Sequence, residues 1–170
     1  NHKTKMKIEL NLINESHVGE KYVDWLNDYD VVRYTEQRFT HHKESEIKSY
    51  VKHILSSESE FLYGIFHEDV HIGNIKIGPI NTQHQVADIG YIIGEKTYWG
   101  KGVMTEAIRI ASGYCKEIYK LKKITAGVYE NNKASMKVLQ NSGFNQEGIL
   151  RSQVGFEGDR INVLLFGKLL

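Results

Sequence analysis

The spacing of apolar residues divides the first half of the chain into strand-like and helix-like segments. Residues 6–13 alternate apolar and polar positions, which is the pattern of a half-buried strand. Residues 61–67 and 71–80 are two further strand-like runs, and the short polar link 68–70 predicts that they form a hairpin. Pro79 is expected to end the second of these strands, because proline has no N–H for a strand ladder.

Two helices are predicted around these strands. Ser16 is a suitable N-cap for a first helix, whose apolar residues between Val18 and Leu26 recur at helical spacing. A second helix is predicted from about Lys43 to Leu55, because its apolar residues fall on one face.

Strands and helices alternate in the second half. The predicted order is strand 86–93, helix 103–119, strand 123–129, helix 133–141, and strands 144–155 and 160–168. Gly143 suits the C-terminal end of the shorter helix. We therefore predict one α/β (α+β) domain over residues 1–170, with a mixed, largely antiparallel sheet of about seven strands and about four helices.

Composition limits the classes of function. The chain has 170 residues, of which 41% are hydrophobic and 25% charged, and its formal net charge is +1. These are values of a globular domain, and the charge offers no broad surface for nucleic acid or an anionic membrane. No apolar run approaches the roughly 20 residues of a membrane span, and no signal peptide is recognisable. We expect a cytoplasmic protein.

The single cysteine, Cys115, lies on the apolar face of the long predicted helix and is interpreted as a core residue. One cysteine excludes an internal disulfide bond and a cysteine-based zinc site. His41 and His42 have no acidic or cysteine partner at ligand spacing, so a solvated loop is the preferred interpretation and no metal is expected.

A glycine turn between a strand and a helix is the most informative local feature. The strand that ends in Ile89–Gly94 is followed by Tyr98–Thr105, in which Gly100 and Gly102 precede the helix. Free backbone N–H groups at a helix N-terminus bind anions such as phosphate. The spacing fits neither the P-loop nor the dinucleotide fingerprint, whose third glycine is replaced by Thr105. A tight turn that binds nothing remains the alternative.

Three further motifs accompany the glycine turn. The segment Asp24–Tyr34 precedes it, and the sequence Asn132-x-x-Ser135 and the Gly143–Arg151 run that continues through Gly158-Asp159 follow it. Together with the glycine turn they make the chain resemble the GNAT superfamily of N-acetyltransferases. The resemblance extends from about Lys7 to Leu170. It is strongest to the branch that contains the ribosomal-protein alanine acetyltransferases and many amino-sugar acetyltransferases.

The resemblance implies acetyl-CoA as co-substrate and assigns its binding residues. The backbone of the strand before the turn would hold the pantetheine arm, provided that the sheet opens there; its residues are Tyr91, Ile92 and Ile93. The glycine turn and the first helical turn would hold the pyrophosphate through Trp99, Gly100, Lys101, Gly102, Val103, Met104 and Thr105. Met104 is bulkier than the family prefers at its position. A simple buried strand predicts the same apolar residues.

The resemblance also assigns catalytic roles. Asn132 would contact the pantetheine and Ser135 would protonate the departing thiolate, although both can instead serve only to cap their helix. Many members carry a Glu and a Tyr where this chain has about Gly127 and Leu139. Since the amine must lose a proton before attack, we predict Asp88 as the base.

His84 is the second candidate for the base. No Gly-x-Ser-x-Gly motif supports a serine hydrolase.

The acceptor is predicted least sharply. Its wall is expected to come from residues 25–39, residues 83–88 and the final hairpin. Helix packing is the alternative for Trp25, which lies on the apolar face of its predicted helix. We predict an N-acetyltransferase that acts on a small-molecule amine such as an amino sugar. A peptide N-terminus is the alternative acceptor, and a non-catalytic acyl-CoA-binding module is the alternative class. Both a monomer and a homodimer are compatible with the sequence.

Overall fold

A computed structural model describes residues 6–170; residues 1–5, which the predicted domain includes, lie outside the described residues. The strands are β1 (Ile8–Leu12), β2 (Phe61–His67), β3 (Val70–Asn81), β4 (Val86–Ile93), β5 (Lys123–Tyr129), β6 (Asn145–Phe156) and β7 (Asp159–Leu169). The α-helices are α1 (Glu20–Asn27), α2 (Tyr29–Val32), α3 (Glu44–Ser56), α4 (Val103–Glu117) and α5 (Lys133–Asn141). Short 3-10 helices are η1 (Glu15–His17), η2 (Glu36–Phe39) and η3 (Lys96–Tyr98).

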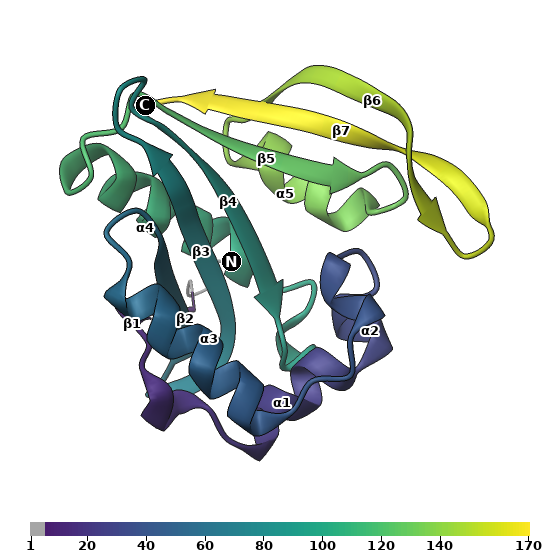
Figure 1. Cartoon of the computed structure of the whole chain (residues 1–170). Coiled ribbons are helices and arrows are strands. Elements are labelled where there is room, and N and C mark those ends of the chain that lie inside the picture. The colour runs from purple at the N-terminus through teal and green to yellow at the C-terminus, as the bar shows by residue number, and fades with distance from the viewer. Residues whose placement is uncertain (1–5) are drawn as a thin grey trace, which may run out of the picture.

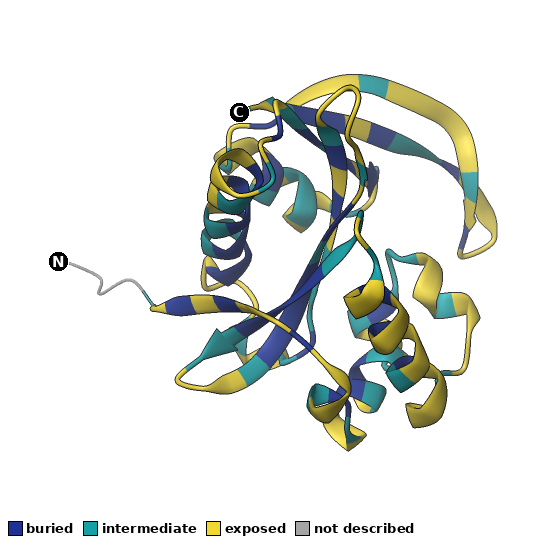
Figure 2. Cartoon of the chain, turned by 60° about the vertical axis from the view of Figure 1, so that its left-hand side comes forward, coloured by how far each residue is buried: buried dark blue, intermediate teal, exposed yellow. Residues whose placement is uncertain are grey.

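All seven strands form one sheet in the order β1-β2-β3-β4-β5-β7-β6. Every neighbouring pair is antiparallel except β4 and β5, which are parallel and are joined by α4. The predicted mixed, largely antiparallel sheet of seven strands is therefore confirmed. Helices α4 and α5 lie on one side of the sheet and α1 to α3 on the other (Figures 1 and 2).

The main core lies between the sheet and α4. It joins alternate strand residues to the apolar face of α4, where Ala107, Ile108 and Cys115 have no measurable exposure. Burial raises the pKa of the Cys115 thiol to about 12, which suits the predicted core residue and not a nucleophile. A second core cluster, around Trp25 and Val51, fixes α1 and α3 on the opposite side.

Two predicted boundaries are wrong for local reasons. Ser16 does not cap a long helix; Asn14 accepts a hydrogen bond from the Ser16 N–H (2.9 Å) and caps η1 instead, so α1 begins only after Gly19. Pro79 does not end its strand. β3 continues to Asn81. Its pairing with β4 shifts register between Ile77 and Ile80, so Pro79 lies at an irregularity where the ladder needs no N–H from it, and the pairing resumes at Ile80.

Candidate active site

The glycine turn leads into the N-terminus of α4. Gly100 and Gly102 have φ angles of 72° and 77°, in the left-handed region that favours glycine, and Gly102 is the N-cap of α4. A Cβ atom added to either residue would meet no protein atom within 4 Å. The glycines are thus required by the conformation of the turn, and the space outside it is open.

The neighbouring side chains leave this space free. Val103 and Met104 are buried in the main core, so the bulk of Met104 points away from the turn. The Trp99 indole Nε1 donates to the Ile93 carbonyl (2.9 Å) and fastens the turn to the end of β4. Lys101 is exposed. Together these contacts hold the first amides of α4 at an accessible surface, as an anion site requires.

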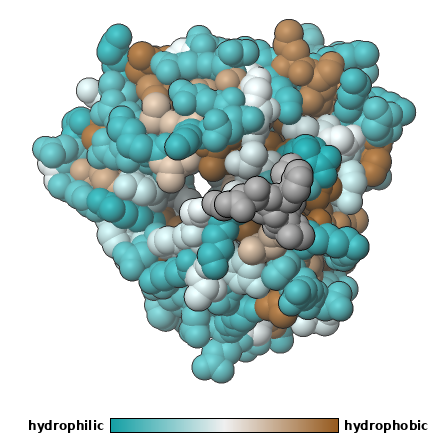
Figure 3. All heavy atoms as spheres, turned by 180° about the vertical axis from the view of Figure 1, so that it is seen from behind, coloured by the Kyte–Doolittle hydropathy of each residue, from teal (hydrophilic) through white to brown (hydrophobic). Residues whose placement is uncertain are grey.

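The sheet opens next to this turn. β4 and β5 pair only from Val86 to Asp88 with Lys123 to Thr125, and beyond that point the two strands diverge (Figure 1). Seen from the opposite side, the molecule is hollowed near the centre of its face (Figure 3). The opening that the predicted pantetheine contacts need is therefore present.

The register of β4 decides which of its backbone groups face this opening. In antiparallel pairing, successive residues direct their N–H and C=O groups to opposite sides. The Gly94 N–H donates to the Ile72 carbonyl of β3 (2.9 Å), and Ile92 lies two residues away in an unbroken register. Tyr91 and Ile93 consequently direct their backbone groups toward the opening, whereas Ile92 directs its own toward β3.

Helix α5 brings Asn132 and Ser135 to the same opening. The Asn132 Oδ1 accepts from the Ser135 N–H (3.2 Å), so Asn132 caps α5, as the purely structural interpretation expected. The Ser135 hydroxyl, in turn, forms a hydrogen bond with the Tyr91 hydroxyl of β4 (2.5 Å). Leu139, at the place of the family's tyrosine, is completely buried. The hydroxyl groups available here are therefore those of Ser135 and Tyr91.

The Asp88 side chain lies on the face of β4 opposite to the Tyr91 side chain, at the point where β4 and β5 separate. The Thr125 hydroxyl donates to its Oδ1 (2.9 Å). Asp88 is exposed on the face of the sheet, but partial desolvation by its neighbours raises the pKa of its carboxyl above the ordinary value, while the Thr125 hydrogen bond and the nearby Lys76 charge oppose this shift. A carboxyl with a raised pKa is a stronger base than an ordinary aspartate.

His84 is placed less favourably. It lies in the exposed turn between β3 and β4, where its backbone N–H donates to Asn81 Oδ1 (3.0 Å). It lies four positions before Asp88 in the sequence, in the direction away from the opening.

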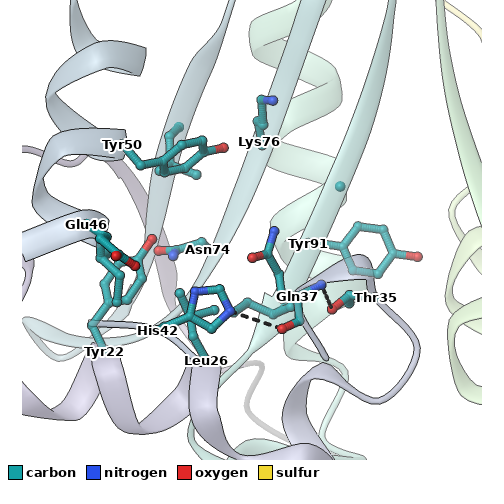
Figure 4. A pocket seen from close by; sticks show the side chains of 14 residues that line it. Tyr22, Leu26, Thr35, Gln37, His42, Glu46, Tyr50, Asn74, Lys76 and Tyr91 are labelled. Atoms are coloured by element: carbon teal, nitrogen blue, oxygen red, sulfur yellow. Dashed lines mark hydrogen bonds between the residues drawn. The ribbon is translucent and has the colours of Figure 1, made fainter. Parts of the chain in front are cut away.

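A pocket of about 370 Å³ lies on the face of the sheet that Asp88 shares. Its floor is formed by β3 and β4, and its walls by α1, α3 and the segment around η2 (Figure 4). The lining residues are Tyr22, Leu26, Thr35, Gln37, His42, Glu46, Ile47, Tyr50, Leu62, Asn74, Lys76, Gly90, Tyr91 and Ile92. A Cβ at Gly90 would meet nothing within 4 Å, so the floor is open at that residue.

Polar side chains in the pocket are held by partners behind it. Asn74 is buried, and its Oδ1 bonds to His71 Nε2 (2.7 Å). Burial lowers the pKa of His71, which therefore stays neutral and can donate this bond at neutral pH. Lys76 is paired with Glu60 (2.8 Å), which neutralises most of its charge. The pocket thus combines an apolar surface, which includes aromatic rings, with a few hydrogen-bonding side chains.

The predicted acceptor wall is only partly found. Trp25 is 4% exposed and belongs to the core; its ring packs so closely on Gly94 that a Cβ there would come within 2.0 Å of it. Thr35 and Gln37 do line the pocket, but residues 83–88 do not. α3 and β3 were predicted as elements, but neither was predicted to line the acceptor pocket. A polar Asn74 inside an apolar strand was the signal available.

The final hairpin contacts the segment around η2 instead of lining the pocket. Arg38 Nη1 donates to the Tyr129 hydroxyl (2.7 Å) and Nη2 to the Gly155 carbonyl (2.9 Å). The Tyr129 hydroxyl donates to Glu36 Oε1 (2.6 Å). These bonds, which we call the Arg38 bridge, connect the pocket wall to β5 and the β6–β7 hairpin across the opening of the sheet.

No group of three or more histidine, cysteine or acidic side chains within residues 6–170 is placed to hold a metal ion. In the same range, no helix is both long and apolar enough to cross a membrane.

Comparison with known proteins agrees with this geometry. A family model described as an acetyltransferase (GNAT) domain matches residues 7–145. The chain is 36% identical over 135 residues to the probable N-acetyltransferase YjcK of Bacillus subtilis (strain 168), covering 78% of this chain and 69% of that protein. It is 29% identical over 104 residues to the ribosomal protein uS5-alanine N-acetyltransferase of Escherichia coli (strain K12), covering 59% of this chain and 53% of the relative.

A solved structure of similar fold is the spermidine N-acetyltransferase from Vibrio cholerae in complex with CoA and spermine. It superposes with a TM-score of 0.86 at 21% identity and covers 95% of both chains.

Proposed function

Because the chain belongs to the acetyltransferase (GNAT) domain family, we propose that it transfers the acetyl group of acetyl-CoA to the primary amine of a small molecule such as an amino sugar. One observation carries the proposal. Strand β4 borders the opening of the sheet along one edge and forms the floor of a pocket, largely apolar with several polar side chains, on one face. A donor in the opening and an acceptor in the pocket would meet at this strand.

Acetyl-CoA would bind mainly through backbone groups. The amides from Gly100 to Met104 would hold the pyrophosphate, assisted by the helix dipole of α4. The backbone groups of Tyr91 and the N–H of Ile93 would hold the pantetheine arm as an added strand, while the Ile93 carbonyl is bound by the Trp99 indole. The capping bond of Asn132 uses its oxygen and leaves its amide nitrogen to donate to the same arm.

The chemistry would be direct attack on the thioester. Asp88 accepts a proton from the amine, directly or through water, and the amine nitrogen attacks the carbonyl carbon. The carbon–sulfur bond breaks and the sulfur takes the hydroxyl proton of Ser135, which recovers a proton from solvent. The amine proton thus ends in solvent through Asp88, and all protons balance.

The pocket supports a polar, weakly charged acceptor. Asn74, Gln37, Tyr22 and Tyr50 offer hydrogen bonds and ring faces of the kind that sugars use. The charge of Lys76 is paired with Glu60. Glu46 is the one carboxylate among the residues that line the pocket. A polyamine, which carries several positive charges, would need more carboxylates than this lining provides.

A peptide N-terminus is the second candidate acceptor. It is supported by the similarity to the uS5-alanine N-acetyltransferase, although that match covers 59% of this chain. A CoA-binding module without catalysis is the alternative of another class, suggested by Gly127 and Leu139.

A thiol-release assay with acetyl-CoA tests the proposal. Glucosamine and other amino sugars, spermidine, an aminoglycoside and short peptides with different first residues would be compared at equal concentrations. We expect the highest kcat/KM with an amino sugar. A preference for peptides would overturn the small-molecule acceptor. CoA binding without thiol release from any amine would overturn the enzymatic function.

A further inference from the structure

Ser135 is not the only hydroxyl group at the opening between β4 and β5. Tyr91 reaches the same point from β4, and its hydroxyl forms a hydrogen bond with the Ser135 Oγ (2.5 Å). The Tyr91 ring packs against the main core and its side chain points away from the other pocket residues, toward β5 (Figure 4). A polar tip on an otherwise buried ring needs a partner, and Ser135 supplies it.

We propose that Tyr91 is a positioning residue for the acetyl transfer, and that its hydroxyl donates to Ser135 Oγ so that the Ser135 proton is free to point at the thioester sulfur. This inference rests on the proposed function. A serine hydroxyl has one proton and two acceptor lone pairs. When Tyr91 fills one lone pair, the serine proton can be directed elsewhere, and the opening is where the thioester would lie.

The surroundings of Tyr91 keep its hydroxyl able to act as the donor of this bond, as the proposal requires. Burial raises the pKa of the Tyr91 hydroxyl to about 12, so it remains protonated and able to donate throughout the neutral range. The backbone N–H of Ser135 is already bound to Asn132, which fixes the serine at the first turn of α5. Leu139 cannot supply a hydroxyl, and Tyr91 provides one from a neighbouring strand.

The same geometry has a consequence after transfer. As the carbon–sulfur bond breaks, negative charge develops on sulfur and then on the serine oxygen that gives up its proton. The Tyr91 O–H stabilises that oxygen without itself losing a proton, and Ser135 is reprotonated by solvent. The Tyr91 hydroxyl therefore acts through Ser135 and does not itself contact the reacting atoms.

Tyr91→Phe tests the inference, because it removes the hydroxyl and keeps the ring. We expect kcat to fall about tenfold, with the KM for acetyl-CoA unchanged, whichever of glucosamine, spermidine or an alanine-led peptide is the fastest acceptor. Ser135→Ala should lower kcat at least as much, and the double variant should be no slower than Ser135→Ala alone. Additive losses would overturn the inference.

A second measurement does not need an acceptor. The thiol of CoA, with an ordinary pKa of about 8.5 for a thiol, should ionise more easily when Ser135 donates to it. Thiolate absorbance of bound CoA should show its pKa rising by about one unit in Ser135→Ala and by a smaller amount in Tyr91→Phe. An unchanged thiol pKa in Tyr91→Phe would contradict the positioning role. Absence of CoA binding to the wild-type protein would instead overturn the proposed function, and this inference with it.

Tyr114→Phe is the matched control. Tyr114 packs against the same core cluster, and its hydroxyl reaches only the Leu10 carbonyl (3.5 Å), away from Ser135. Neither kcat nor the thiol pKa should change in this variant. If Tyr114→Phe and Tyr91→Phe behave alike, the effect of Tyr91 is on packing and the inference fails.

Discussion

The two halves of the candidate site are built from different parts of the chain. In the β4–α4–β5 unit, the anion turn and the opening are made largely of backbone groups, and they come from one continuous segment, Val86–Tyr129. The pocket on the opposite face is made of side chains from α1, η2, α3, β3 and β4, which are far apart in sequence. A backbone site tolerates most side-chain changes but depends on conformation. A side-chain site can change with every substitution.

The largest expected effect is on the backbone site. Gly102→Val places a β-branched residue at a φ of 77°, which is strained for any L residue with a side chain. We expect the turn to shift and the affinity for acetyl-CoA to fall by on the order of 100-fold, about 2.7 kcal/mol, as measured by calorimetric titration.

Gly113→Ala is the control for this change. Gly113 lies in the middle of the same helix, a Cβ there meets nothing within 4 Å, and alanine favours helix. It should raise the melting temperature slightly and leave CoA binding intact. A folded Gly102→Val protein with normal affinity would remove the reason for placing the pyrophosphate at this turn.

The next effect concerns Asp88, which lies where β4 and β5 separate, on the face of the sheet that carries the pocket. Asp88→Asn should lower kcat by roughly 100-fold while the affinity for CoA stays the same. In the wild-type protein, the rate should fall as the pH decreases through the raised pKa of Asp88, because the protonated carboxyl cannot accept the amine proton. This acidic limb of the pH–rate profile should be absent from Asp88→Asn.

Thr125→Val sharpens the assignment. Its hydroxyl bond lowers the pKa of Asp88, so removing it should raise that pKa further and move the acidic limb to higher pH. A wild-type rate and profile in Asp88→Asn would mean that the base lies elsewhere, with His84 or solvent as the next candidates.

The smallest expected effect is on the side-chain site. Arg38→Ala removes the Arg38 bridge and should raise the KM for the acceptor several-fold, with a loss of about 1–3 kcal/mol in the free energy of unfolding. CoA affinity should not change. Arg109→Ala, which removes the ion pair of an exposed arginine with Glu106 on α4, is the control and should change stability less than Arg38→Ala and leave the KM for the acceptor unchanged. Equal effects of the two substitutions would contradict a role of the bridge in shaping the pocket.

Elements fixed by local sequence could be predicted, whereas contacts between distant segments could not. The bounds of β4, β5 and α5 match the predicted ranges. The periodicity of the apolar residues, the positions of the glycines and the helix cap Asn132 all indicate the same boundaries there. Ser16 misled the prediction because Asn14 competes for the same cap two residues earlier. Trp25 lies within the predicted acceptor segment but is buried in the core, in agreement with the alternative that its helical spacing indicated.

The pocket itself could not be derived in this way. Asn74 and Tyr50 meet only because α3 crosses the sheet over β3, and no local pattern encodes that crossing. The hydrogen bond between Tyr91 and Ser135 likewise joins residues 44 positions apart. Contacts of this kind depend on the path of the chain and become visible only in three dimensions.

Gly90 gives the pocket a place where its size can be set independently of the fold. It lies on the floor, and a methyl group added there would enter empty space and touch no other side chain. A single substitution at this residue would therefore make the pocket shallower while the core, the opening and the anion turn stay as they are. Replacement of Gly90 by alanine and then by valine would restrict the pocket to progressively smaller amines, which makes this residue useful for engineering acceptor size.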